Sequence, residues 1–147
     1  MNRDYYKIQT NTNRMIYEFE SEGPNGRIKK EVQYTMVNLD GFVYYNLGFG
    51  DLNINGDVDD LSISNNKDRD KILATVAQTV IQFTEYLPNA LIYVEGSTPV
   101  RTRLYQMAIA LNLKDISEFL TIYGLKNRQW HSFEKNTNYE AFLSLRK

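Results

Sequence analysis

The chain has 147 residues, of which 42% are hydrophobic and 24% are charged, and its net charge is -1. These proportions are those of one globular domain spanning residues 1–147, and they exclude a disordered chain. With no cysteine and one histidine, the sequence also excludes disulfides, thiolate zinc sites and cysteine nucleophiles. We expect neither a structural metal nor a cofactor.

The sequence predicts a soluble, cytoplasmic protein. Its first residues, Met1 to Lys7, contain no apolar stretch of the kind found in signal peptides. The longest apolar run, residues 90–94, is too short to cross a bilayer. The nearly neutral charge gives no general attraction to nucleic acid or to acidic membranes. We expect no membrane association. Binding to a protein partner and formation of a homo-oligomer are both compatible with the sequence.

Alternating apolar and polar residues in the first third of the chain predict an antiparallel meander. Its three strands are expected at 15–20, 28–37 and 42–47. The turns between them are predicted by Asn25-Gly26 and Asp40-Gly41, since such pairs tolerate the positive φ of a tight hairpin. A polar stretch follows, with one short strand expected within it at 58–63.

A long helix is predicted next. Asn66 is a suitable N-cap, and Asp68 and Asp70 stand in the first turn, where the helix dipole favours carboxylates. Pro88 ends the helix. Helical spacing predicts one buried stripe formed by Ile72, Leu73, Val76, Ala77, Val80, Ile81, Thr84 and Leu87.

The continuously apolar segment 90–94 predicts a strand that is covered on both sides. Ser97-Thr98-Pro99 opens a second helix, because a capping residue directly precedes a proline at the first helical position. The apolar stripe of this helix is predicted to contain Val100, Leu104, Met107, Ala108 and Leu111. One more helical turn is expected at 115–118, followed by strands at 119–123, 128–133 and 139–145.

The predicted fold class is therefore α+β: an antiparallel strand meander, then helix–strand–helix, then C-terminal strands, with the helices packed on one sheet. This order is loosely similar to that of ribonuclease-H-like proteins. The metal-dependent enzymes of that fold carry acidic residues on the first strand and on the strand after the first helix. Here only Glu18, Glu20 and Glu95 could stand there, and the first two alternate like solvent-facing residues. We do not expect nuclease chemistry, because fold analogy is weak evidence for function.

Residues 96–107 read Gly-Ser-Thr-Pro-Val-Arg-Thr-Arg-Leu-Tyr-Gln-Met. With segments 50–60, 64–77 and 139–142, they resemble a family of small bacterial proteins classed as a domain of unknown function. The resemblance covers the chain from its first strand onward, and the segment 96–107 is its most specific part. It implies a standalone bacterial protein and implies no activity.

Residues Asp51 to Ser62 have the spacing of a calcium-binding loop as far as the ninth loop position. Ser62 stands where such a loop has the glutamate that closes the coordination sphere. The loop also follows a strand rather than a helix. A hairpin turn at Asn55-Gly56 explains the same residues, so we expect no calcium.

The best candidate for a ligand site is an anion site at Gly96 to Arg103. Gly96, Ser97 and Thr98 lie between a strand and a helix start, where unpaired N–H groups and the helix dipole attract anions. Arg101 and Arg103 could hold a phosphate or carboxylate, and Arg101 is expected to be the closer because it lies in the first turn. A phosphate-binding P-loop is excluded, since there is no second glycine and no Gly-Lys-Ser/Thr. The alternative is an ordinary N-cap with solvated arginines.

No residue is assigned a catalytic role. His131 has no nucleophile or carboxylate partner that can be assigned to it, which favours a structural role. We therefore expect a non-enzymatic binding or interaction module with an anion site at Gly96–Arg103. The alternative is an enzyme acting on a phosphate-containing substrate or nucleic acid, using that site with Glu95 or an aspartate of the 51–60 loop.

Overall fold

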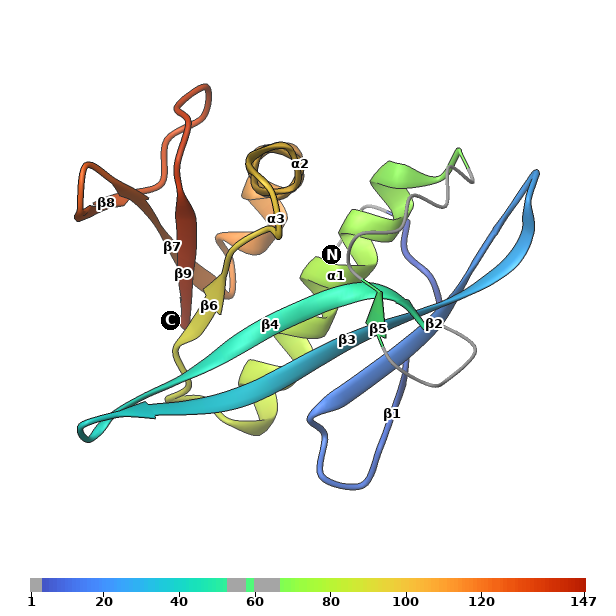
Figure 1. Cartoon of the computed structure of the whole chain (residues 1–147), viewed down its shortest axis with the longest axis horizontal. Helices are drawn as coiled ribbons and strands as arrows, with labels where there is room; N and C mark the ends of the chain where they lie inside the picture. The colour runs from blue at the N-terminus through green and yellow to red at the C-terminus, as the bar shows by residue number, and fades with distance from the viewer. Residues whose placement is uncertain (1–3, 53–57, 60–66) are drawn as a thin grey trace.

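The computed structural model describes residues 4–52, 58–59 and 67–147. In these ranges the chain forms one large sheet and three helices (Figure 1). The predicted α+β class is confirmed: an N-terminal meander leads into a mixed, mostly antiparallel sheet with the helices packed against it.

The meander begins with a short strand that was not predicted. Its strands are β1 (Gln9–Thr10), β2 (Ile16–Gly23), β3 (Gly26–Leu39), β4 (Phe42–Leu52) and β5 (Val58–Asp59). Both predicted hairpins are present. Gly23 pairs with Gly26 across the first turn, and Gly26 has the positive φ of 84°. In the second turn Asp40 and Gly41 have φ of 51° and 91°, which a tight hairpin of this kind requires.

The later strands join the same sheet out of chain order. They are β6 (Ile92–Val94), β7 (Leu120–Lys126), β8 (Gln129–Ser132) and β9 (Ala141–Arg146). The strand order is β1-β2-β3-β4-β6-β9-β7-β8, with β5 paired to β4. Only the pairing of β6 with β4 is parallel among the described strands. The predicted C-terminal strands are confirmed, with ends shifted by a few residues.

The first helix, α1 (Arg69–Tyr86), packs on the sheet as predicted. Its core contact is a stack between Phe83 and Tyr34 of β3, with ring centroids 4.1 Å apart. The hydroxyl groups of Tyr34 and Thr79 are 2.9 Å apart, so the buried Tyr34 hydroxyl has a partner. The N-cap is Asp68, and the expected cap, Asn66, lies outside the described residues.

The second helix, α2 (Pro99–Leu111), is rotated relative to the prediction. Val100, Met107 and Leu111 were expected in the core, but they are 67%, 46% and 46% exposed. Thr102 and Gln106 are buried in their place. The Thr102 hydroxyl accepts the Gly96 N–H and the Gln106 side-chain oxygen accepts the Tyr139 N–H, which lowers the cost of burying these two side chains.

The expected extra turn is a short helix, α3 (Leu113–Ile116), which begins two residues earlier than predicted. Among the described residues, no helix has the length and apolar character needed to cross a bilayer.

The prediction that residues 90–94 are covered on both sides is wrong in one respect. Ile92 is fully buried on the helix side of the sheet. Tyr93 points to the other face, where it is half-buried by aromatic side chains and not by a helix. The helices therefore cover one face of the sheet, and in Figure 1 α1 crosses behind β3 and β4.

Candidate functional site

A pocket of about 370 Å³ opens where β6 ends and α2 begins. The segment just before β9 forms its other wall. The residues that line it are Glu95, Gly96, Ser97, Thr98, Pro99, Thr102, Arg103, Gln106, Asn138, Tyr139 and Glu140. Four of the five residues predicted for the anion site are thus brought together, and Arg101 is not among the lining residues.

Gly96 allows the loop to lie directly against the first turn of α2. A Cβ at this position would be 2.4 Å from the backbone nitrogen of Thr102 and 2.7 Å from the carbonyl carbon of Arg101. The Gly96 N–H donates to the Thr102 hydroxyl at 3.0 Å, and that hydroxyl donates to the Thr98 carbonyl at 3.2 Å. Close packing therefore requires the glycine, and this packing fixes the wall of the pocket.

The start of α2 has the cap that the sequence predicts. The Thr98 hydroxyl accepts the backbone N–H of Arg101 at 3.2 Å, and Pro99 occupies the first turn. The backbone N–H groups of Ser97 and Thr98 have no hydrogen-bond partner within the described residues. The ordinary N-cap and unpaired donors therefore coexist at the same helix end.

Gln106 adds a donor that sequence reasoning missed. Its side chain is 7% exposed, and its carbonyl oxygen accepts the backbone N–H of Tyr139 at 3.1 Å. Because a backbone N–H can only donate, the side-chain oxygen must face Tyr139. The amide NH₂ group then has no partner in the described part of the chain. Helical spacing was the available signal, since Gln106 lies three and four residues after Arg103 and Thr102.

The pocket contains charges of both signs. Arg103 is exposed and forms no ion pair with any described residue. Glu95 and Glu140 line the same pocket, and Glu95 accepts a hydrogen bond from the Tyr93 hydroxyl at 2.9 Å. Arg103 lines the pocket where Arg101 does not, because two residues on a helix diverge by about 200°. The arrangement suits a ligand with one anionic group and one donor or cationic group.

Ser97, Glu95 and Glu140 line this pocket, but no hydrogen bond between described residues pairs the Ser97 hydroxyl with either carboxylate. The hydroxyls of Thr98 and Thr102 are engaged in the capping hydrogen bonds of α2. His131 lies on the edge strand β8, opposite Gly124, and does not line the pocket. The described residues contain no group of three or more metal-ligating side chains that could hold a metal ion.

The acidic residues considered for nuclease chemistry are kept apart by the strand order. Glu18 and Glu20 lie on β2, and two strands separate β2 from β6, which ends next to Glu95. Three strand spacings amount to about 14 Å. In the calcium-like loop, Asp51 and Leu52 belong to β4 and Val58 and Asp59 belong to β5. Its remaining residues, apart from these strand ends, lie outside the described residues.

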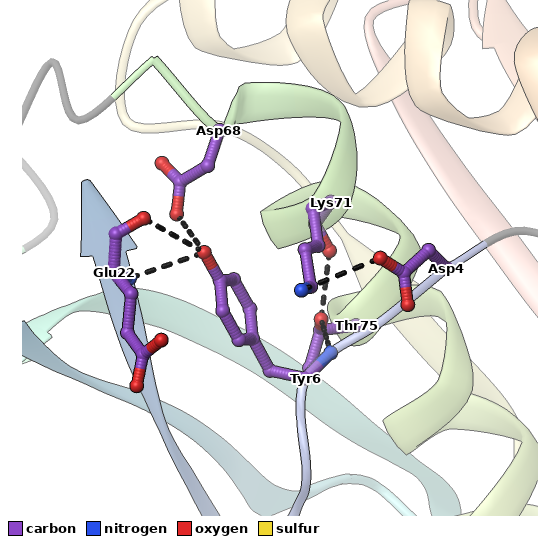
Figure 2. A network of polar contacts seen from close by, with 6 residues as sticks. All are labelled: Asp4, Tyr6, Glu22, Asp68, Lys71 and Thr75. Carbon is purple, nitrogen blue, oxygen red and sulfur yellow. Dashed lines mark hydrogen bonds and ion pairs between the residues drawn. The ribbon is translucent and has the colours of Figure 1, made fainter.

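A second polar cluster ties the N-terminal segment to the start of α1 (Figure 2). The Tyr6 hydroxyl donates to Asp68 Oδ2 at 2.5 Å and accepts the Glu22 backbone N–H at 3.1 Å. The Tyr6 backbone N–H donates to the Thr75 hydroxyl at 2.9 Å. Burial and then the hydrogen bond to Asp68 raise the pKa of the Tyr6 hydroxyl.

The same cluster explains why Asp68 does not cap α1 with its side chain. Asp68 Oδ2 also accepts the Ser21 hydroxyl at 2.5 Å, so this oxygen is held by the N-terminal segment and by β2. Lys71 completes the cluster, with its Nζ 3.3 Å from Asp4 and 4.3 Å from the Tyr6 ring centroid. Asp68 Oδ1 is buried without a hydrogen-bond partner among the described residues, whereas Asp68 Oδ2, Tyr6, Ser21 and Lys71 are paired. We assign the cluster a structural role because its contacts join the N-terminal segment, β2 and α1.

Comparison with known proteins identifies a family and no further relative. No curated protein and no solved structure matches the chain significantly. The resemblance inferred from residues 96–107 and the other segments is confirmed by a family model that matches residues 2–147. The chain belongs to DUF6934, a family of unknown function.

Proposed function

We propose that this protein is a non-enzymatic binding module that holds a small polar ligand in the pocket between β6 and α2. The observation that carries the proposal is the convergence, on one pocket of about 370 Å³, of donors that have no partner among the described residues. These donors are the Arg103 guanidinium, the Gln106 amide and the backbone N–H groups of Ser97 and Thr98. Together they favour a carboxylate or phosphate group.

The two carboxylates narrow the class of ligand. Glu95 and Glu140 repel a ligand with several negative charges, such as a nucleic acid backbone. They favour a ligand that also carries an amine or several hydroxyls, because a carboxylate accepts hydrogen bonds from such groups. An amino acid, a phosphoamine or an acidic sugar has this combination. A setting in the bacterial cytoplasm is part of the proposal, supported by the absence of cysteine and by the family resemblance.

The enzymatic alternative, on a phosphate-containing substrate or nucleic acid, has weaker support. It requires a nucleophile and a base at the anion site. The threonine hydroxyls near Arg103 are engaged in capping, and no hydrogen bond between described residues pairs the Ser97 hydroxyl with Glu95 or Glu140. The lack of a paired nucleophile and base among the described residues favours recognition over catalysis.

A thermal-shift panel of amino acids, phosphoethanolamine, sugar acids, nucleotides and inorganic phosphate tests the proposal. A specific ligand stabilises the folded protein by mass action. We expect a hit among the ligands that carry both kinds of group. Arg103→Ala should then weaken binding by about 1.5–3 kcal/mol, or roughly 10–150-fold.

Two matched variants sharpen the test. Gln106→Glu retains the acceptor for Tyr139 and replaces the NH₂ donor by a carboxylate oxygen, so it should weaken binding of the anionic group. A cooperative melt of the ligand-free variant is required before its binding is compared, because Gln106 is 7% exposed. Arg101→Ala is the control, because Arg101 is not a lining residue. Stabilisation by none of the ligands, or equal losses in Arg101→Ala and Arg103→Ala, would refute the proposal.

A further inference from the structure

Four aromatic side chains form a row on the face of the sheet that the helices leave uncovered. Phe42 and Tyr44 belong to β4, Tyr93 to β6 and Trp130 to β8. Successive ring centroids are 6.0, 5.7 and 6.2 Å apart. These four residues are called the aromatic row below.

The strand register places the row on that face. Ile92, which is fully buried, is paired with Tyr45 of β4, whose ring packs against Phe83 of α1. Their neighbours Tyr93 and Tyr44 must point the opposite way, because successive side chains of a strand alternate. The two ends of the row are open to solvent: Phe42 is 56% and Trp130 is 41% exposed. A contiguous aromatic surface with exposed ends and half-buried central rings is a candidate interaction site.

The angles between neighbouring rings indicate which shape of partner fits the aromatic row. Interplanar angles along the row are 44°, 55° and 85°. Flat ligands such as nucleic-acid bases stack on the faces of aromatic rings, and a series of stacked bases needs rings that are close to parallel. Rings packed at large angles expose edges as well as faces, so they form an uneven surface instead. Puckered proline rings pack on uneven aromatic surfaces, as in the aromatic grooves that bind proline-rich peptides.

The length of the row fits the same partner. A polyproline II helix has three residues per turn and rises about 3.1 Å per residue, so the residues on one of its faces recur about every 9.3 Å. Three ring-to-ring steps of 5.7–6.2 Å give the row a length of at most about 18 Å, which is about two turns of such a helix. Two turns of the helix would therefore cover the row.

The charge beside the row is negative. The Tyr93 hydroxyl donates to Glu95 Oε2 at 2.9 Å. Burial is the main cause that raises the pKa of Tyr93 to about 12, followed by the hydrogen bond and charge of Glu95 and by the nearby Tyr44 and Glu140. Among the described residues, the ionised groups that act on Tyr93 are thus carboxylates, which attract lysine or arginine and repel phosphate.

We propose that the aromatic row docks a proline-rich peptide segment in the polyproline II conformation, with a lysine or arginine of that segment paired to Glu95. The site is separate from the ligand pocket except at Glu95, which borders both.

Trp130 makes the test direct, because it is the one tryptophan of the chain and lies at the end of the row. The probe is a synthetic peptide with a run of about eight prolines, long enough to cover the row, and an arginine at one end. We expect a saturable change in tryptophan fluorescence. The same peptide with glycine in place of proline should give none, because glycine does not hold the bound conformation.

Single substitutions test the separate contributions of the aromatic row and of Glu95 to peptide binding. Phe42→Ser removes an exposed ring and should weaken peptide binding roughly tenfold without affecting folding. Tyr86→Ser is the matched control, since Tyr86 is 45% exposed at the end of α1 and is not part of the row. Glu95→Gln should weaken binding of the arginine-containing peptide and leave binding of the same peptide without arginine unchanged. Arg103→Ala should leave peptide binding intact, which distinguishes this surface from the ligand pocket.

Three results would overturn the proposal. The first is the absence of saturable binding by the proline peptide. The second is a stronger fluorescence response to a single-stranded oligothymidylate, which would identify a nucleic-acid surface. The third is a dimer in sedimentation experiments that Phe42→Ser dissociates, which would show that a second copy of the chain covers the row.

Discussion

Replacing Gly96 by alanine tests whether close packing fixes the wall of the ligand pocket. The new methyl group would be 2.4 Å from the Thr102 nitrogen and 2.7 Å from the Arg101 carbonyl carbon. Both are backbone atoms of the first helical turn, so no side-chain rotation can relieve the overlap. The loop and the helix must move apart, and the hydrogen bond from the Gly96 N–H to Thr102 is then lengthened or lost.

The expected loss of folding free energy in Gly96→Ala follows from these distances. Forcing extra atoms into a packed site costs about 1–3 kcal/mol, and loss of one hydrogen bond adds about 1 kcal/mol. For a domain of this size, each kcal/mol lowers the melting temperature by roughly 2–4 °C. We therefore expect Gly96→Ala to melt about 4–16 °C below the wild type in a calorimetric scan.

Gly48→Ala is the matched control on the same sheet. A Cβ there would meet only the Gln33 carbonyl oxygen, at 4.0 Å. Alanine in place of glycine in a strand gains about 0.5–1 kcal/mol, so this variant should melt at the wild-type temperature or slightly above it. If Gly96→Ala melts as Gly48→Ala does, the pocket wall is not fixed by packing and the reasoning fails.

Two further predictions concern the core and the effect of pH. Val80→Asp should abolish the cooperative melt, because Val80 is 8% exposed in the core and an unpaired charge would be buried there. Val100→Asp should change the free energy of unfolding by less than about 0.5 kcal/mol, because Val100 is 67% exposed. Equal melting behaviour of the two variants would contradict the packing of both helices. Burial raises the pKa of the Glu31 carboxyl; the hydrogen bond from Gln33 opposes this shift in part, and Glu18, paired with Glu31 across β2 and β3, adds to it. The folded state therefore binds the Glu31 proton more tightly than the unfolded state. The contribution of Glu31 to the free energy of unfolding is consequently lost as the pH rises above about 4.3. Glu31→Gln should accordingly stabilise the protein in urea titrations at pH 7, with a gain that shrinks toward pH 4, and a gain independent of pH would refute the linkage.

Sequence patterns correctly predicted the turns and the helix whose structure depends on residues that are close together in the chain. The Asp40-Gly41 turn requires two positive φ values, and these residue types are among the few that adopt them. The buried stripe of α1 was predicted because its apolar spacing persists over the whole helix. Tertiary structure then buried further residues of α1, such as Thr75, Thr79 and Phe83, which the stripe does not contain.

Long-range partners decided the elements that were predicted wrongly. In α2 the apolar residues at Val100, Met107 and Leu111 have the spacing of a core stripe, but that face is exposed. The buried face contains Gln106, whose hydrogen-bond partner Tyr139 is 33 residues further along the chain. A helical pattern cannot reveal such a partner. Nor can it reveal the insertion of β9 between β6 and β7, which depends on pairing between distant strands.

The predicted anion site coincides with a pocket of the structure, and ligand binding there stays a prediction. The glycine between a strand and a capped helix was the sequence signal for this position. The choice between Arg101 and Arg103 depended on the rotation of α2 about its axis, and tertiary contacts set that rotation. Gln106 was missed for the same reason, although it shares a helix face with Arg103.

Glu95 connects the two proposed binding surfaces, because it stands one residue beyond the end of β6. Alternation along the strand places Tyr93 on the helix-free face, and Glu95 then reaches back to the Tyr93 hydroxyl while lining the ligand pocket. A carboxylate has two oxygens and can accept more than one hydrogen bond, so it can serve a ligand and a docked arginine together. The hydrogen bond from Tyr93 also fixes the direction of the carboxylate, which lowers the entropic cost of binding at either surface. The end of β6 is therefore the position where a change of one side chain is expected to affect both surfaces, while Arg103 and Phe42 each affect one.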